Sequence, residues 1–197
     1  DFRRQRQMCI RDSNYAYERT AYSKGAVFLG QLAYIVGYEN LFNILRAYYN
    51  EWKFKHPLPN DFRRIAERIS GIQLQWYLTD WTQTTNKIDY AISGVEDKGE
   101  ESKINLIRNQ IMPMPLELLV VLKNGESELH YIPISLMRGE KANPYPIKWV
   151  VHPDWAWAHL EYSFLIDHPK EEIQTIIIDP SGLMADVDKS NNYYASE

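Results

Sequence analysis

Cysteine and long apolar runs are both scarce in this sequence, and their scarcity excludes several kinds of protein. Cys9 is the only cysteine among 197 residues, so neither an intrachain disulfide nor a thiolate zinc site can form within the chain. The most apolar stretch, residues 26–38, contains Gln31 and is shorter than the roughly 20 residues that a membrane-spanning helix needs. We therefore predict a chain that folds by packing alone and has no membrane span.

Positive charge is not in excess either, because 22 lysines and arginines are outnumbered by 26 aspartates and glutamates. The resulting net charge of −4 excludes a protein that binds nucleic acid through its overall charge. Arg3, Arg4, Arg6 and Arg11 form a small basic group, but it lacks the lysines and stacking aromatics of a nucleic-acid surface. We expect a solvated face there and no nucleic-acid partner.

Motifs for metal or covalent catalysis are also missing. None of the five histidines lies in the His-Glu-x-x-His pattern that binds zinc on one face of a helix. His152 and His159 are seven residues apart in what reads as a loop, and we interpret both as structural. The serines, histidines and aspartates show no spacing typical of a catalytic triad. We expect no cofactor or metal to be held by this chain on its own.

Roughly the first 85 residues are predicted to be helical, because their apolar side chains recur every three or four positions. Gly37 is a good stop for the first clear helix, since glycine accepts the backbone conformation that ends many helices. Asn60 or Asp61 can cap a later helix through a side-chain oxygen, and Ser70 and Gly71 close it. We expect a helical bundle or superhelical layer built from residues 22–36, 39–52, 60–69 and 74–81.

After Thr85 the apolar period changes to two, which is typical of strands. Asn124 and Gly125 predict a tight hairpin with a type I′ turn, in which both central residues have positive φ. We therefore expect a helical unit over residues 1–86 and an antiparallel immunoglobulin-like β-sandwich over residues 87–197. The predicted strands are residues 88–95, 103–108, 116–123, 128–136, 148–151, 161–166 and 174–178.

One series of short motifs resembles a known family. It begins with Tyr22-Ser23-Lys24-Gly25-Ala26 at the head of a helix and continues in the family's order over residues 21–92. The chain is similar here to the C-terminal part of the M1 family of zinc aminopeptidases. The later members of the series are Gly37, the helix end at 48–54, Pro59 with Asp61 and Phe62, Ser70-Gly71, Trp81, and finally Ile178-Asp179-Pro180 with Asn191-Asn192.

The resemblance implies a parent enzyme that binds zinc and removes N-terminal residues from peptides. It assigns to Tyr22 the role of stabilising the transition state, and to Tyr17 that of a second tyrosine facing the site. The zinc-binding helix, the third zinc ligand and the Gly-x-Met-x-Asn motif of the family are absent from all 197 residues. We therefore expect a piece of a longer protein, inactive alone, whose zinc and peptide substrate are bound by an upstream catalytic domain. Such a piece is expected to self-associate through its uncovered face.

Two alternatives stay open. In the first, the strands form a non-catalytic binding module in which Trp149, Trp155 and Trp157 make an aromatic platform for a protein or glycan. In the second, the parent is an M1-like protein that has lost its zinc ligands. The exposure of the three tryptophans separates the first alternative from the aminopeptidase hypothesis. The sequence leaves the compartment, the oligomeric state and the preferred substrate side chain open.

Overall fold

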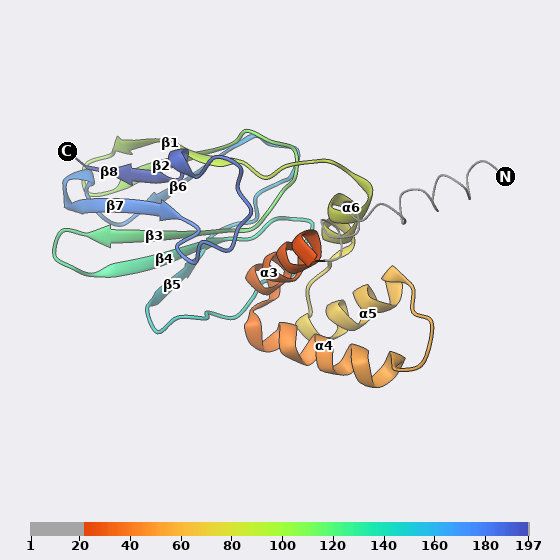
Figure 1. Cartoon of the computed structure of the whole chain (residues 1–197). Coiled ribbons are helices and arrows are strands. Elements are labelled where there is room, and N and C mark those ends of the chain that lie inside the picture. Colours follow the sequence, from red (N-terminus) through yellow and green to blue (C-terminus); the bar gives the residue numbers. More distant parts are fainter. Residues whose placement is uncertain (1–21, 197) are drawn as a thin grey trace.

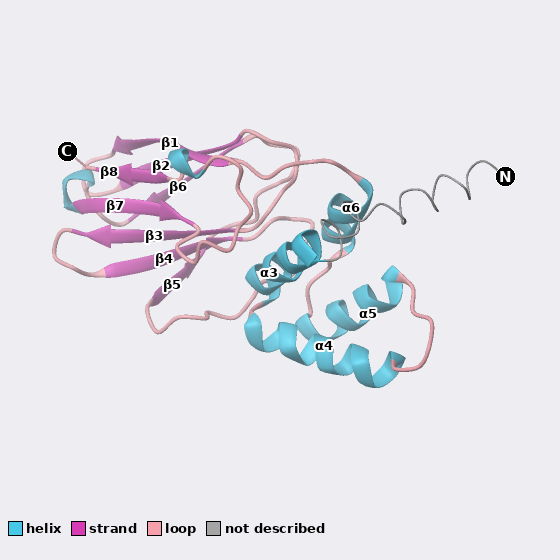
Figure 2. Cartoon of the chain, in the orientation of Figure 1, coloured by secondary structure: helices cyan, strands magenta, loops and turns pink. Residues whose placement is uncertain are grey.

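The computed structural model describes residues 22–196, in which helices come first and strands follow (Figures 1 and 2). Each predicted helix and each predicted strand between these residues is present, and one further short strand, β8, was not predicted. No helix in this part of the chain has the length and hydropathy to cross a membrane. The elements are α3 (Gly25–Val36), α4 (Tyr38–Trp52), α5 (Pro59–Ser70), α6 (Gln75–Gln83), β1 (Tyr90–Asp97), β2 (Ser102–Arg108), β3 (Leu116–Leu122), β4 (Ser127–Ile132), β5 (Lys148–Val151), β6 (Glu161–Ile166), β7 (Ile173–Ile178) and β8 (Tyr193–Ala195), with the short 3-10 helices η2 (Lys170–Glu172) and η3 (Lys189–Asn191).

The ends of the helices follow from local chemistry. Gly37 ends α3 with φ of 85°, and its N–H donates to the Ala33 carbonyl at 2.8 Å, as the sequence predicts. The start of α5 differs from the prediction that side-chain oxygens of Asn60 and Asp61 accept from the N–H groups of the first turn. Asp61 lies inside the first turn, where its Oδ2 accepts a hydrogen bond from the Leu58 N–H at 2.8 Å. Pro59 takes the first helical position, because proline has no N–H to leave unsatisfied there.

The strands form two sheets, with orders β1-β2-β6 and β5-β4-β3-β7-β8. All strand pairs are antiparallel except β4 and β5, which are parallel. The prediction of a wholly antiparallel sandwich is therefore wrong at β5. A long connection from Pro133 to Ile147 separates β4 from β5, and such a connection permits a parallel pairing that a hairpin cannot make. The described chain is a mixed α/β structure with two sheets, and this arrangement does not establish an immunoglobulin-like sandwich.

The hairpin between β3 and β4 forms where Asn124 and Gly125 predict it, but its turn is of another type. Gly125 has φ of 90°, whereas Asn124 is not among the described residues with positive φ, so the turn is not type I′. The Gly125 N–H donates to the Leu122 carbonyl at 2.9 Å, and Asn124 Oδ1 accepts from the Glu126 N–H at 2.9 Å. The longer loop that results is stabilised by the Asn124 side chain.

Helices and strands share buried contacts. The helices lie together at one end of the two sheets (Figure 1). One cluster of buried apolar residues includes Ile35 and Ile44 from the helices together with Leu116 and Ile176 from the strands. The division into units of residues 1–86 and 87–197 stays a prediction.

A buried ion pair lies where α3 meets β3. Lys141, in the connection between β4 and β5, pairs with the Glu117 carboxylate of β3, and the two side chains are only 5% and 1% exposed. Lys141 Nζ also donates to the Tyr34 carbonyl of α3 at 2.6 Å. The Tyr34 hydroxyl accepts a hydrogen bond from the Glu117 N–H at 3.0 Å. These three residues, named here the Tyr34–Glu117–Lys141 junction, join a helix, a strand and a loop.

Burial makes the charge on Glu117 costly. Burial raises the pKa of the Glu117 carboxyl, although Lys141 acts in the opposite direction. A buried ion pair contributes little net stability for this reason, but a partner left alone is strongly destabilising. The junction therefore acts mainly by fixing how α3 sits on β3.

We predict that Lys141→Met lowers the free energy of unfolding by about 3–5 kcal/mol at pH 8, because it leaves the Glu117 charge buried without a cation. The loss should shrink at pH 5, since a carboxyl with a raised pKa takes up a proton on folding and then needs no cation. Urea denaturation at both pH values measures the effect. Arg68→Met, which breaks the exposed Arg68–Glu51 pair, is the control and should change stability by less than about 1 kcal/mol. Equal stability of Lys141→Met and the wild type would contradict the prediction.

Candidate functional site

Tyr22 lies at the head of α3, where residues 22–24 form a π-helical turn before Gly25. Its side chain is 66% exposed, while residues 31–36 of the same helix are buried. The helix thus has a buried C-terminal half and an accessible first turn. Tyr17 lies outside the described residues, so the structure does not place it. The catalytic roles of both tyrosines remain predictions.

A cavity of about 280 Å³ opens between the head of α3, the end of α6 and loops that flank the strands. Its wall includes Lys24, Asp80, Trp81 and Met112, but Tyr22 does not line it. Asp80 is already engaged, because its Oδ1 accepts from the Asn86 side-chain amide at 2.8 Å. The described lining residues include no histidine, no cysteine and no second carboxylate. This cavity therefore offers charged groups but no acid–base pair of its own.

One face of α4 is aromatic and accessible. Tyr38, Phe42 and Tyr49 are four and seven residues apart, which places them on the same side of a helix. Each of these side chains is more than half exposed. Lys53 Nζ lies 5.9 Å from the centre of the Tyr49 ring, at the end of this row. We name these three side chains the α4 aromatic stripe.

The three tryptophans of the predicted platform do not share one surface. Trp155 is buried, its ring stacks on that of Tyr162 at 5.2 Å, and its Nε1–H donates to the His159 carbonyl at 2.9 Å. Trp149 is partly buried and stacks on Tyr131 at 5.0 Å. Trp157 alone is exposed. A three-tryptophan platform is therefore wrong as an interpretation, because Trp155 belongs to the core.

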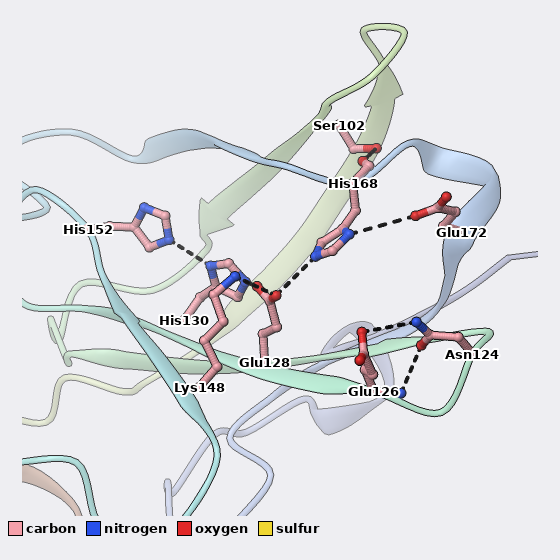
Figure 3. Close-up of polar contacts among 9 residues, drawn as sticks. All are labelled: Ser102, Asn124, Glu126, Glu128, His130, Lys148, His152, His168 and Glu172. Carbon is pink, nitrogen blue, oxygen red and sulfur yellow. Dashed lines mark hydrogen bonds and ion pairs between the residues drawn. The ribbon is translucent and has the colours of Figure 1, made fainter.

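A polar cluster that the sequence analysis missed surrounds Glu128 of β4 (Figure 3). Glu128 Oε1 accepts from Lys148 Nζ at 2.6 Å and lies 3.0 Å from His168 Nε2, while Oε2 lies 3.5 Å from His130 Nε2. Burial raises the pKa of the Glu128 carboxyl, but hydrogen bonds from Lys148 and His168 outweigh it, and the net shift is downward. Glu128 is therefore the charged centre of the cluster.

His130 and His152 form the other half of the cluster. His130 Nδ1 lies 2.9 Å from His152 Nε2, and the two rings are nearly parallel with centres 5.1 Å apart. Figure 3 shows His152 reaching His130 from the segment that follows β5. The two histidines are 22 residues apart in the chain, and no motif links them. Only the parallel pairing of β4 with β5 brings them together.

The donor set of the described residues does not fit a zinc ion. Within residues 22–196, no group of three or more His, Cys, Asp or Glu side chains is placed to hold a metal. Glu128 presents different oxygens to His130 and His168, and Lys148 already balances its charge. The zinc implied by the sequence resemblance stays a prediction.

Comparison with known proteins adds a likeness of fold. No family model matches the sequence, and no curated protein sequence matches it. Among solved structures, the chain is similar to Legionella pneumophila aminopeptidase A in complex with aspartic acid, with a TM-score of 0.59. The two are 11% identical, and the match covers 87% of this chain but only 18% of that chain. The described chain is thus a mixed α/β structure whose fold resembles a small part of an aminopeptidase.

Proposed function

We propose that this chain is the C-terminal part of an M1-type zinc aminopeptidase, a class that removes N-terminal residues from peptides. The observation that carries the proposal is the agreement of two independent likenesses. The ordered motifs from Tyr22 to Trp81 resemble that family, and the fold resembles part of an aminopeptidase. In this proposal residues 1–86 end the catalytic domain, and residues 87–197 form the β-domain that follows it. Zinc, when bound by the upstream residues, would polarise the scissile carbonyl.

Tyr22 is the residue of this chain that we assign to the reaction. Its hydroxyl would donate a hydrogen bond to the oxyanion of the tetrahedral intermediate, where negative charge develops. Two features of the structure support this role. The side chain is largely exposed at the head of α3, and the second half of the same helix is buried and bonded to β3 through Tyr34.

The α4 aromatic stripe supports the remainder of the proposal. Tyr38, Phe42 and Tyr49 lie on the helical side of the molecule, as does Tyr22. We assign this side to contact with the upstream catalytic domain. Without that domain the stripe is exposed to water. Contact with a second copy of the chain would bury it instead.

We predict that Tyr22→Phe in the full-length parent lowers kcat by about 10²- to 10³-fold, the cost of losing one oxyanion donor. Zinc content and melting temperature should not change, because the ring still packs. Tyr193→Phe, at an exposed tyrosine of β8, is the matched control and should retain full activity. Hydrolysis of an aminoacyl p-nitroanilide measures all three proteins. A parent whose rate is indifferent to Tyr22→Phe would contradict the assignment.

The 197-residue chain alone should neither cleave this substrate nor retain zinc through dialysis.

We also predict that the 197-residue chain self-associates through the α4 aromatic stripe. Phe42→Gln removes one apolar side chain from the stripe and keeps a good helix former. It should weaken association about tenfold or more, since burying such a side chain contributes roughly 1.5–3 kcal/mol. Sedimentation velocity over a range of concentrations measures the association. Leu160→Gln, at an exposed apolar side chain between β5 and β6, is the control. A chain that stays monomeric at every concentration, or an equal effect of both variants, would contradict the prediction.

A further inference from the structure

The contact between His130 and His152 requires at least one neutral ring. Their nitrogens Nδ1 and Nε2 are 2.9 Å apart, so one nitrogen donates a proton and the other must accept it. When both rings carry a proton, neither nitrogen can accept, and two positive charges lie in contact. His130 has little access to water that could screen this repulsion, because its side chain is 3% exposed. The contact is therefore stable only while the pair is not doubly protonated.

The groups around the pair do not compensate an added positive charge. From β4, Glu128 lies 3.5 Å from His130 Nε2, but its charge is already balanced by Lys148 of β5 at 2.6 Å. From the segment after β6, His168 also contacts Glu128 and is itself 3.7 Å from Glu172 of η2. Phe164 of β6 contributes only an uncharged ring. The centre of this ring lies 4.1 Å from the centre of the His152 ring and 5.6 Å from that of the His130 ring. Asp167 and Glu126 act on Lys148 from a greater distance.

The pair ties an edge strand to the sheet. β5 is the last strand of its sheet and pairs on one side only, with β4. Three side-chain contacts reinforce this short pairing, and one of them is the stack of Trp149 on Tyr131. Lys148 contacts Glu128 directly opposite it, and His152 contacts His130 just beyond the end of the strand. The backbone adds one bond there, from the His152 N–H to the Tyr131 carbonyl at 2.9 Å.

We propose that the His130–His152 contact is an acid-sensitive clasp, which holds β5 on β4 at neutral pH and releases β5 when the pair takes up protons. Release leaves one edge of β4 unpaired, and an unpaired edge is a surface on which another strand can pair. The clasp is independent of the aminopeptidase proposal, because it concerns strands of this chain alone.

The direction of the pH effect follows from burial. Burial, together with the neighbouring His152, lowers the pKa of His130 to about 4, and burial also lowers the pKa of His152. A released His130 would titrate near 6.5, so the released state binds protons more readily than the clasped state. The clasp is therefore fully effective above about pH 6.5 and weakens as the pH falls from there towards 4. Between pH 7.5 and pH 5, protonation of His130 should raise the population of the released state, relative to the clasped state, about 30-fold.

Hydrogen exchange tests the clasp. In the wild-type chain, the protection of β5 amides, corrected for the intrinsic exchange rate, should fall about 30-fold between pH 7.5 and pH 5, while β3 amides change far less. His130→Gln keeps a side-chain amide that can contact His152 but does not titrate, and it should remove the contribution of His130, leaving only the fall that His152 itself causes. His159→Gln, at an exposed histidine of the loop after β5, should behave as the wild type.

Two outcomes would overturn the proposal. One is an equal loss of protection in β3 and β5, which would mean that acid lowers global stability only. The other is an unchanged fall in His130→Gln. If that variant does not fold, the imidazole titration of His130 in the wild type, followed by NMR, decides the matter. Titration below pH 5 supports the clasp, and titration above pH 6 overturns it.

Discussion

The Tyr34–Glu117–Lys141 junction is the contact on which the relation between helices and strands depends. A carboxylate and an ammonium group from different parts of the chain are both removed from water there and form an ion pair, and the ammonium group also donates to the Tyr34 carbonyl. Apolar contacts alone tolerate small shifts of one layer on another, but a buried charge has few positions in which it is compensated. The junction therefore restricts α3 to one placement on β3, and the apolar core packs around that placement.

This restriction has a consequence for the accessible surface. The second half of α3 is held in the core, while its first turn and Tyr22 stay exposed. Gln31 strengthens this placement, since its Oε1 accepts from the Ala185 N–H at 3.0 Å and its amide donates to the Leu183 carbonyl. Gly37 then turns the chain into α4, whose aromatic stripe is also left accessible. The proposed active-site wall is thus an accessible edge of the fold.

The sequence predicted most local structure, because helix and strand periods and glycine stops are local signals. Gly37 is an example, and the strand of residues 148–151 matches β5 completely. Pro133 shortened β4 relative to the prediction, since proline cannot donate to a strand ladder. β8 was missed, as three residues are too few to show a period. The His130–His152 contact could not be predicted, because it depends on a parallel pairing that no turn signal announces.

Native-state hydrogen exchange in increasing urea tests the central claim, that the junction joins helices and strands into one cooperative unit. The slowest amides of α3 and β3 are the probes, because Tyr34 and Glu117 lie on these two elements. Our account predicts that both sets exchange through the same opening, with the same free energy and the same dependence on urea. Exchange of the α3 amides through a lower-energy opening, while β3 stays protected, would show that the helical part unfolds separately and would contradict the account.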